Sequence, residues 1–236
     1  MEALRAGRPL TRILVAKGHR QPHFDELAAM ARRQGISLQT VPREHLDRLS
    51  RTRGHQGIIA IAVDLGYVEL DDVAQRSSMP FLVALDELQD PQNLGAILRS
   101  ADAAGVDAVI CPSRRSAGLS PGTLKAAAGA AEHVPVVRVG NLARTLGILK
   151  QRGLWVVGAD PAADRLYWEA DLSLPLVMVV GGEHRGLRRL TRENCDLLVR
   201  IPMVGRLNSL NAAAAAAILM FEAHRQRRRP PDSPSP

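Results

Sequence analysis

Short apolar segments recur along the chain after Pro80, and longer segments with a helical pattern separate several of them. Near-continuous apolar strands that alternate with helices are typical of a mostly parallel sheet covered by helices on both faces. We therefore expect an α/β fold for this part of the chain. The expected strands are residues 81–85, 106–110, 134–139, 154–158, 176–180 and 197–201, and the expected helices are residues 91–104, 141–152 and 209–224.

A smaller α/β pattern precedes this region. Residues 1–64 contain enough alternating apolar segments for a small core of their own, so we expect them to form a separate domain. The expected strands are residues 13–16, 37–41 and 57–63, and the expected helices are residues 22–33 and 42–49.

The boundaries follow from composition. Residues 65–80 are more polar and contain a plausible helix at 69–76, so we expect a linker there. Residues 81–225 then form the second domain. Residues 226–236 are rich in arginine, proline and serine, which predicts a disordered tail.

Positive charge is concentrated near the N-terminus. Residues 1–64 carry 11 Lys and Arg against 6 Asp and Glu, whereas residues 65–221 carry 16 of each. Clustered positive charge releases counterions from phosphates, so a basic module attached to a neutral domain indicates nucleic-acid binding. A basic surface that only keeps the protein in solution is the alternative.

Other classes of protein are disfavoured. No apolar run approaches the roughly 20 residues that span a bilayer, and the N-terminus lacks the pattern of a secretion signal, so we expect a cytoplasmic protein with no membrane contact. Cys111 and Cys195 are isolated, which argues against a disulfide framework and against a zinc site. No metal is expected.

Ligands of such sheets bind beyond the carboxyl ends of the strands, and three loops there carry unusual residues. In the first, residues 94, 97, 98 and 101 have the spacing of a buried helix face. Arg99 falls about 140° from Leu94 on that helix, away from the buried face. Its side chain is therefore either solvated or reserved for a ligand.

The second loop, residues 180–187, has Gly181, Gly182 and Glu183 directly after the most apolar expected strand. Glycine lets a backbone approach a ligand closely. The loop matches neither GxGxxG nor GxxxxGK[ST], so a dinucleotide fold and a phosphate-binding loop are disfavoured. An ordinary turn is the alternative.

The third loop, residues 201–211, leads into six consecutive alanines at 212–217. It ends with Asn208, Ser209 and Asn211, short polar residues that favour a helix N-terminus, where electron-rich ligand atoms are also attracted. The alternative is a capped core helix.

These segments resemble the three motifs of the SpoU-type RNA 2′-O-methyltransferases of the SPOUT superfamily. The likeness spans residues 81–221, and the small-residue segment 127–131 also fits it. The matching residues are Asn93, Gly95 and Arg99 in the first motif, Gly181 or Gly182 with Glu183 and Gly186 in the second, and residues 201–203 with 209–211 in the third.

The resemblance implies a trefoil knot in the second domain, S-adenosylmethionine as methyl donor and a homodimer. It implies a cofactor cradle at Gly181, Gly182, Ile201 and Leu210. The catalytic candidates that it implies are Asn93, Arg99, Glu183, Ser209 and Asn211.

Residues 1–64 resemble the ribosomal-protein-like RNA-binding domain of the bacterial 23S rRNA guanosine-2′-O-methyltransferases. Arg51, Arg53 and His55 are the candidates for contacts with RNA phosphates, although solvated loop charges would look the same. The expected activity is 2′-O-methylation of a guanosine in 23S ribosomal RNA. The alternatives are methylation of transfer RNA or another ribosomal RNA site, and a non-catalytic RNA-binding protein on the same fold.

Overall fold

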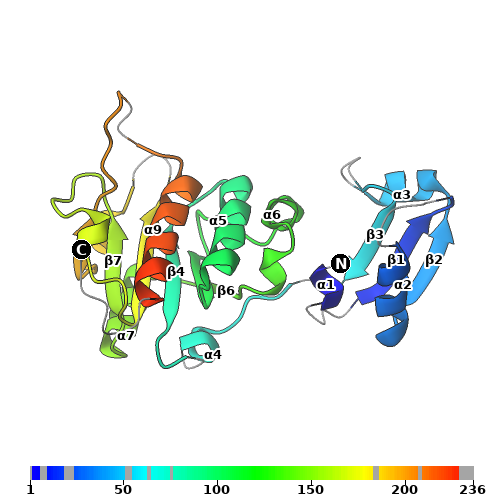
Figure 1. Cartoon of the computed structure of the whole chain (residues 1–236), viewed down its shortest axis with the longest axis horizontal. Helices are drawn as coiled ribbons and strands as arrows, with labels where there is room; N and C mark the ends of the chain where they lie inside the picture. The colour runs from blue at the N-terminus through cyan, green and yellow to red at the C-terminus, as the bar shows by residue number, and fades with distance from the viewer. Residues whose placement is uncertain are drawn as a thin grey trace. The chain divides into compact units, whose positions relative to one another are not determined.

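The computed structural model of the chain divides into two units, Met1–Gly66 and Tyr67–Pro236 (Figure 1). Each unit is described by itself. The described residues are 2–5, 10–18, 24–50, 55–62, 65–74, 77–182, 186–206 and 209–228, without the side chains of residues 2 and 3.

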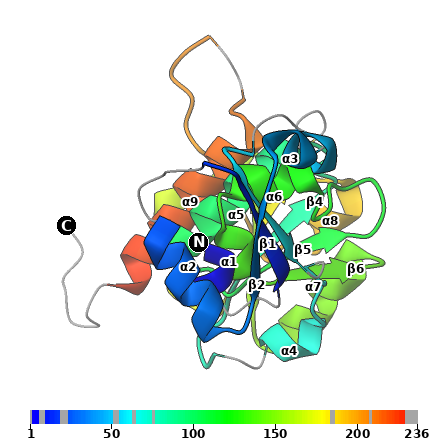
Figure 2. The ribbon, with the colours of Figure 1, turned by 90° about the vertical axis from the view of Figure 1, so that its right-hand side faces the viewer.

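The first unit is a three-stranded sheet with the order β2-β1-β3. The strands β1 (Leu10–Ala16) and β2 (Ser37–Val41) are parallel, and β3 (Ile58–Ala62) is antiparallel to β1. Figure 2 looks onto this unit and shows α2 beside β1 and β2. The helices are α1 (Glu2–Arg5), α2 (Phe24–Arg33) and α3 (Arg43–Leu49).

Alternate residues of β1 face two small cores. Ile13 and Val15 are buried against Leu27 of α2, whereas Leu14 is buried against Leu46 of α3. Because successive side chains of a strand point to opposite faces, one short strand supports a helix on each side. The five predicted elements of this unit are all present, with boundaries that differ by at most three residues.

The second unit is a six-stranded sheet in which every adjacent pair is parallel. The order is β6-β5-β4-β8-β7-β9. This result confirms the predicted α/β fold with a parallel sheet. The strands are β4 (Phe81–Asp86), β5 (Ala108–Pro112), β6 (Val136–Val139), β7 (Trp155–Ala159), β8 (Leu176–Gly181) and β9 (Leu197–Val199).

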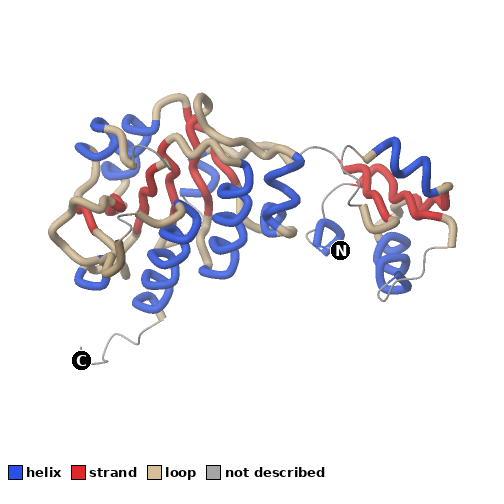
Figure 3. Tube along the Cα trace, turned by 90° about the horizontal axis from the view of Figure 1, so that it is seen from above, coloured by secondary structure: helices blue, strands red, loops and turns tan. Residues whose placement is uncertain are grey.

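Helices cover both faces of this sheet, as the view from above shows (Figure 3). On one face, Leu82 and Ala84 of β4 pack in a core with Leu146 of α7 and Val73 of α4. On the other face, α5 lies against α9 and α6. The helices are α4 (Leu70–Ala74), α5 (Pro91–Ala104), α6 (Pro121–Ala127), α7 (Leu142–Gln151), α8 (Arg189–Glu193) and α9 (Ala212–Arg227), with 3-10 turns η1 (Ala130–Glu132) and η2 (Tyr167–Glu169).

Several details differ from the expectations. The helices α6 and α8 were not predicted. The segment expected as a linker packs into the second unit, because Val68 pairs with Val137 and Val73 is fully buried. The last helix continues through Arg227, past the expected start of the tail. In the described part of the chain, we find no helix with the length and apolar character needed to cross a membrane.

Candidate functional site

The carboxyl ends of the two central strands meet at one edge of the sheet, where Asp86 of β4 pairs with Gly181 of β8. The helix α5 begins a few residues after β4. Asp90 caps it by accepting a hydrogen bond from the Gln92 N–H at 2.8 Å. An acidic cap followed by proline at the first helical position fixes this helix start from local sequence alone.

Asn211 joins the starts of two helices. Its Oδ1 caps α9 by accepting hydrogen bonds from the N–H groups of Ala213 and Ala214, at 2.9 and 3.2 Å. Its Nδ2 donates to Oδ1 of the buried Asn93, in the first turn of α5, at 2.9 Å. The first and third predicted motifs, whose asparagines are 118 residues apart, are therefore in direct contact.

The glycine of the first motif serves helix packing. A Cβ atom on Gly95 would lie 2.4 Å from the Cβ atom of Ala126 and 2.7 Å from the carbonyl oxygen of Thr123. Only a residue without a side chain lets α5 and α6 approach this closely. The segment that follows α6 turns through Ala128 and Gly129, both with positive φ.

The glycines at the end of β8 are enclosed by backbone. A Cβ atom on Gly181 would lie 2.1 Å from the carbonyl carbon of Gly186, and one on Gly182 would lie 2.7 Å from the carbonyl oxygen of Glu87. Gly186 N–H also donates to the Gly182 carbonyl at 3.2 Å. Backbone groups therefore line this strand end. Glu183, between these glycines, lies outside the described residues.

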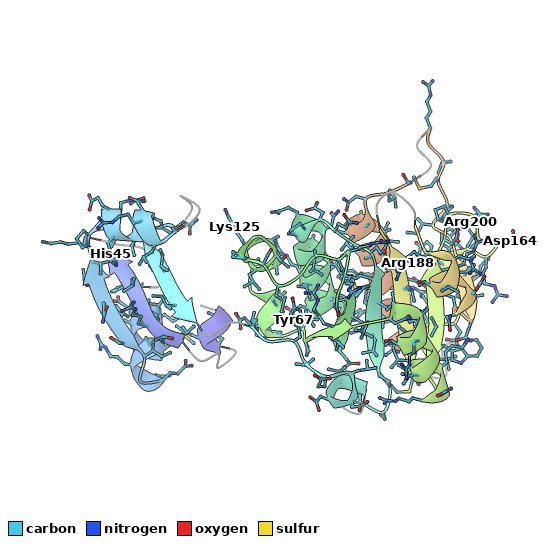
Figure 4. The ribbon with its side chains drawn as sticks, turned by 180° about the vertical axis from the view of Figure 1, so that it is seen from behind. His45, Tyr67, Lys125, Asp164, Arg188 and Arg200 are labelled. Carbon is cyan, nitrogen blue, oxygen red and sulfur yellow. The ribbon has the colours of Figure 1, made fainter. Side chains whose placement is uncertain are left out.

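An ion pair that we did not predict holds the chain beyond this loop. Asp86 is fully buried, and its carboxylate accepts hydrogen bonds from the backbone N–H of Arg188 at 2.8 Å and from Arg188 Nε at 2.7 Å. Arg188, labelled in Figure 4, also donates to Glu87 at 3.3 Å. An acidic residue that ends a fully apolar strand was the available signal, because a buried carboxylate requires a partner.

The remaining predicted residues of the second unit differ in their exposure. Arg99 is exposed on α5 and makes no hydrogen bond or ion pair within the described residues. Ser209 and Leu210 are exposed directly before Asn211, and Ile201 is partly buried. The same described residues include no group of three or more His, Cys, Asp or Glu that could hold a metal ion.

In the first unit, His55 is engaged within the fold. Its Nε2 lies 2.9 Å from Asp47 Oδ1, its Nδ1 accepts a hydrogen bond from the Gly57 N–H at 3.1 Å, and its side chain is 4% exposed. This geometry favours a role in shaping the turn before β3. Arg51 and Arg53 lie outside the described residues.

The sequence matches two families. Residues 80–221 match the SpoU rRNA Methylase family. Residues 1–68 match a family described as RNA 2′-O ribose methyltransferase substrate binding.

Similar proteins match over almost the whole chain or over about two thirds of it. YacO from Bacillus subtilis (strain 168), provisionally named as a TrmH family tRNA/rRNA methyltransferase, is 43% identical, with 96% of this chain and 92% of that protein aligned. The crystal structure of an AdoMet-bound rRNA methyltransferase from Sinorhizobium meliloti has a TM-score of 0.80 at 29% identity, covering 95% of this chain and 83% of that chain. A TrmH/SpoU tRNA-modifying enzyme from A. aeolicus has a TM-score of 0.56 at 29% identity, covering 66% of this chain and 79% of that chain.

Proposed function

Because the chain belongs to the SpoU rRNA Methylase family and is an S-adenosylmethionine-dependent RNA methyltransferase, we propose that it methylates a ribose 2′-hydroxyl of ribosomal RNA, at a guanosine of 23S RNA. The observation that carries this proposal is the hydrogen bond between Asn93 and Asn211. It joins the starts of α5 and α9 beside the glycine-lined end of β8. This contact between two sequence motifs of the family supports one shared site.

The basic first unit supports a ribosomal target. It matches a substrate-binding family over residues 1–68. The rRNA methyltransferase from Sinorhizobium meliloti aligns with 95% of this chain, whereas the tRNA-modifying enzyme from A. aeolicus aligns with only 66%. Transfer RNA is the second candidate, because the name of the Bacillus subtilis relative includes both classes of RNA.

The strand end at Gly181 fits the cofactor. Side chains are excluded at Gly181 and Gly182 by neighbouring backbone, and Ile201 and Leu210 leave part of their apolar surface exposed. Backbone groups with apolar neighbours suit a ligand that combines an adenine ring with polar ends. These four residues would hold S-adenosylmethionine, which supplies an electrophilic methyl group when bound.

Arg99 is the proposed residue for the ribose side of the reaction. A guanidinium stays protonated in proteins, so it is a poor base. We assign Arg99 to the phosphate next to the reacting ribose and to the negative charge that develops on the 2′-oxygen. Ser209 and Glu183 are proposed to orient the hydroxyl and Arg99. Asn211, which caps α9, fixes the segment that contains Ser209.

The outer face of α9 supports the proposed homodimer. Ile218 and Phe221 are 36% and 47% exposed, and Ala214 and Ala217 lie one turn before them on the same helix. Small side chains beside two large apolar ones allow two copies of the helix to pack closely. Light scattering would measure the mass in solution. The trefoil knot and the cytoplasmic location stay predictions.

The test is transfer of labelled methyl from S-adenosylmethionine to unmodified 23S, 16S and transfer RNA, followed by mapping of alkali-resistant linkages. One resistant guanosine linkage in 23S RNA is the expected result. A linkage in transfer RNA would favour the second candidate. Cofactor binding without transfer to any of the three RNAs would contradict the proposed target.

Two variants test the assigned roles. Arg99→Ala should abolish methyl transfer with little change in cofactor affinity, because Arg99 is assigned to the RNA. Gly181→Val should weaken cofactor binding, because a side chain there meets the backbone of Gly186. Calorimetric titration with S-adenosylmethionine measures both affinities. An equal loss of cofactor affinity in the two variants would contradict the assignment.

A further inference from the structure

The loop between β5 and α6, residues 113–120, lies at the same edge of the sheet as Asp86 and Gly181, because it follows a parallel strand adjacent to β4. The backbone N–H of Ala117 donates to the Leu88 carbonyl at 2.7 Å, and both side chains are buried. The loop is therefore attached to the segment that leads from β4 into the first motif. We call residues 113–120 the β5–α6 loop.

Arg138 of β6 anchors the β5–α6 loop. Its guanidinium stacks on the ring of Tyr67 at 4.9 Å and donates to the Tyr67 hydroxyl at 3.3 Å. The same hydroxyl accepts a hydrogen bond from the Leu119 N–H at 3.1 Å, and Tyr67 is labelled in Figure 4. Nη2 of Arg138 donates to the carbonyl of Pro112, the last residue of β5 (3.4 Å), and to two loop carbonyls, those of Ser113 (3.2 Å) and Ser116 (3.5 Å).

The anchored loop contains a strained turn. Arg115 has a φ of 55°, in the left-handed region that non-glycine residues avoid at a cost of roughly 1–2 kcal/mol. Such strain persists where surrounding contacts determine the conformation, and it clusters at functional sites. Here, the contacts of Arg138 and Tyr67 hold the loop in this conformation. Both Arg114 and Arg115 are exposed on the turn.

Among the described residues, the charges around this turn leave Arg114 uncompensated. Arg115 lies 3.7 Å from Glu87, which also pairs with Arg188. Asp86 pairs with Arg188 as well. The carboxylates of Asp86 and Glu87 thus pair with the guanidinium groups of Arg188 and Arg115. Within the described residues, Arg114 makes neither a hydrogen bond nor an ion pair.

We propose that the turn at Arg114 and Arg115 binds the RNA backbone, with Arg114 holding a phosphate close to the ribose that is methylated. The inference rests on the proposed function, because it needs an RNA strand that crosses this edge of the sheet. A guanidinium presents a planar set of donors that matches a phosphate. The anchored loop presents that group at little entropic cost, since its backbone is already fixed.

The test compares Arg114→Ala with Arg152→Ala. Arg152 follows α7 and precedes β7 at the opposite edge of the sheet, where it pairs with Asp71, so its variant removes one guanidinium away from the site. Filter binding to unmodified 23S RNA, repeated over a range of salt concentrations, measures the RNA affinity. We expect Arg114→Ala to weaken binding by about tenfold and to reduce the dependence of log Kd on log salt by about one.

Arg152→Ala should leave both quantities unchanged, and Arg114→Lys should restore most of the affinity. Cofactor affinity should be the same in all three variants. Tight RNA binding by the wild type with an unchanged Arg114→Ala variant would overturn this inference and leave the proposed function intact. A wild-type protein that does not bind unmodified 23S RNA would overturn both this inference and the proposed function.

Discussion

Replacement of Arg227 by methionine should destabilise the second unit. Arg227 is the last residue of α9, and its guanidinium lies 4.9 Å from the Phe81 ring centroid. It joins the end of this helix to the segments that enter β4 and β8. Its donors reach four backbone carbonyls, those of Met79 (2.9 Å), Pro80 (3.1 Å), Leu172 (3.3 Å) and Leu174 (2.5 Å).

The expected loss follows from these contacts. A hydrogen bond to a charged group contributes about 1.5–3 kcal/mol, but carbonyls near the surface regain water when the donor is removed. We therefore count the four bonds as equivalent to one or two full ones and expect a loss of about 3 kcal/mol. For a unit of this size, the corresponding decrease in Tm is about 6–12 °C. Methionine retains the apolar stem, so the change isolates the guanidinium.

Tryptophan fluorescence in guanidinium chloride is a suitable assay, because the two tryptophans of the chain, Trp155 and Trp168, both lie in the second unit. The control is Arg225→Met, which removes an exposed guanidinium that, within the described part of the chain, pairs only with Glu222 on the same helix. This control should be nearly neutral. Equal unfolding midpoints for the two variants would refute the assigned role of Arg227.

Two further predictions concern packing and thiol chemistry. Gly95→Ala should cost about 2 kcal/mol in thermal or chemical unfolding, because its methyl group would lie 2.4 Å from the Cβ atom of Ala126, whereas Gly122→Ala, which meets nothing closer than 3.6 Å, should be neutral or stabilising. Burial raises the pKa of both the Cys111 and the Cys195 thiols to about 12, so a disulfide reagent at pH 8 should label neither thiol in the native protein and both after unfolding. Rapid labelling of the native protein would contradict this. The free energy of unfolding linked to these thiols should decrease as the pH rises from about 9 toward 12, because the unfolded state loses its thiol protons first.

Much of the fold could be predicted because buried parallel strands consist of continuous apolar residues. The strands β4 and β8 are buried along nearly their whole length, and both were expected within one residue of their ends. The helix α6 was missed because Pro121 and Gly122 indicate a turn as strongly as a helix start. The helix α8 has five residues and no apolar face that a periodicity could reveal.

The site was predicted as three segments, but their contacts could not be. The spacing around Arg99 correctly places its side chain off the buried face of α5. The Asp86–Arg188 ion pair was missed because its two residues are far apart in the sequence. A buried carboxylate needs a cationic partner, but only the tertiary structure shows which one lies beside it. The sequence gives no sign that Gly95 and Gly181 have different roles. In the structure, Gly95 permits close packing of two helices, whereas Gly181 permits a close backbone contact at a strand end.

The amide of Asn211 explains why this position is not simply a helix cap. Aspartate would cap α9 equally well, but it has no N–H group to donate to Asn93. Because Oδ1 of Asn211 accepts from two backbone N–H groups, its Nδ2 must face Asn93 and must find an acceptor there. The backbone of α9 thereby fixes the orientation of both amides. The Nδ2 donor of Asn93, in the first turn of α5, is consequently set by a helix that begins more than a hundred residues later.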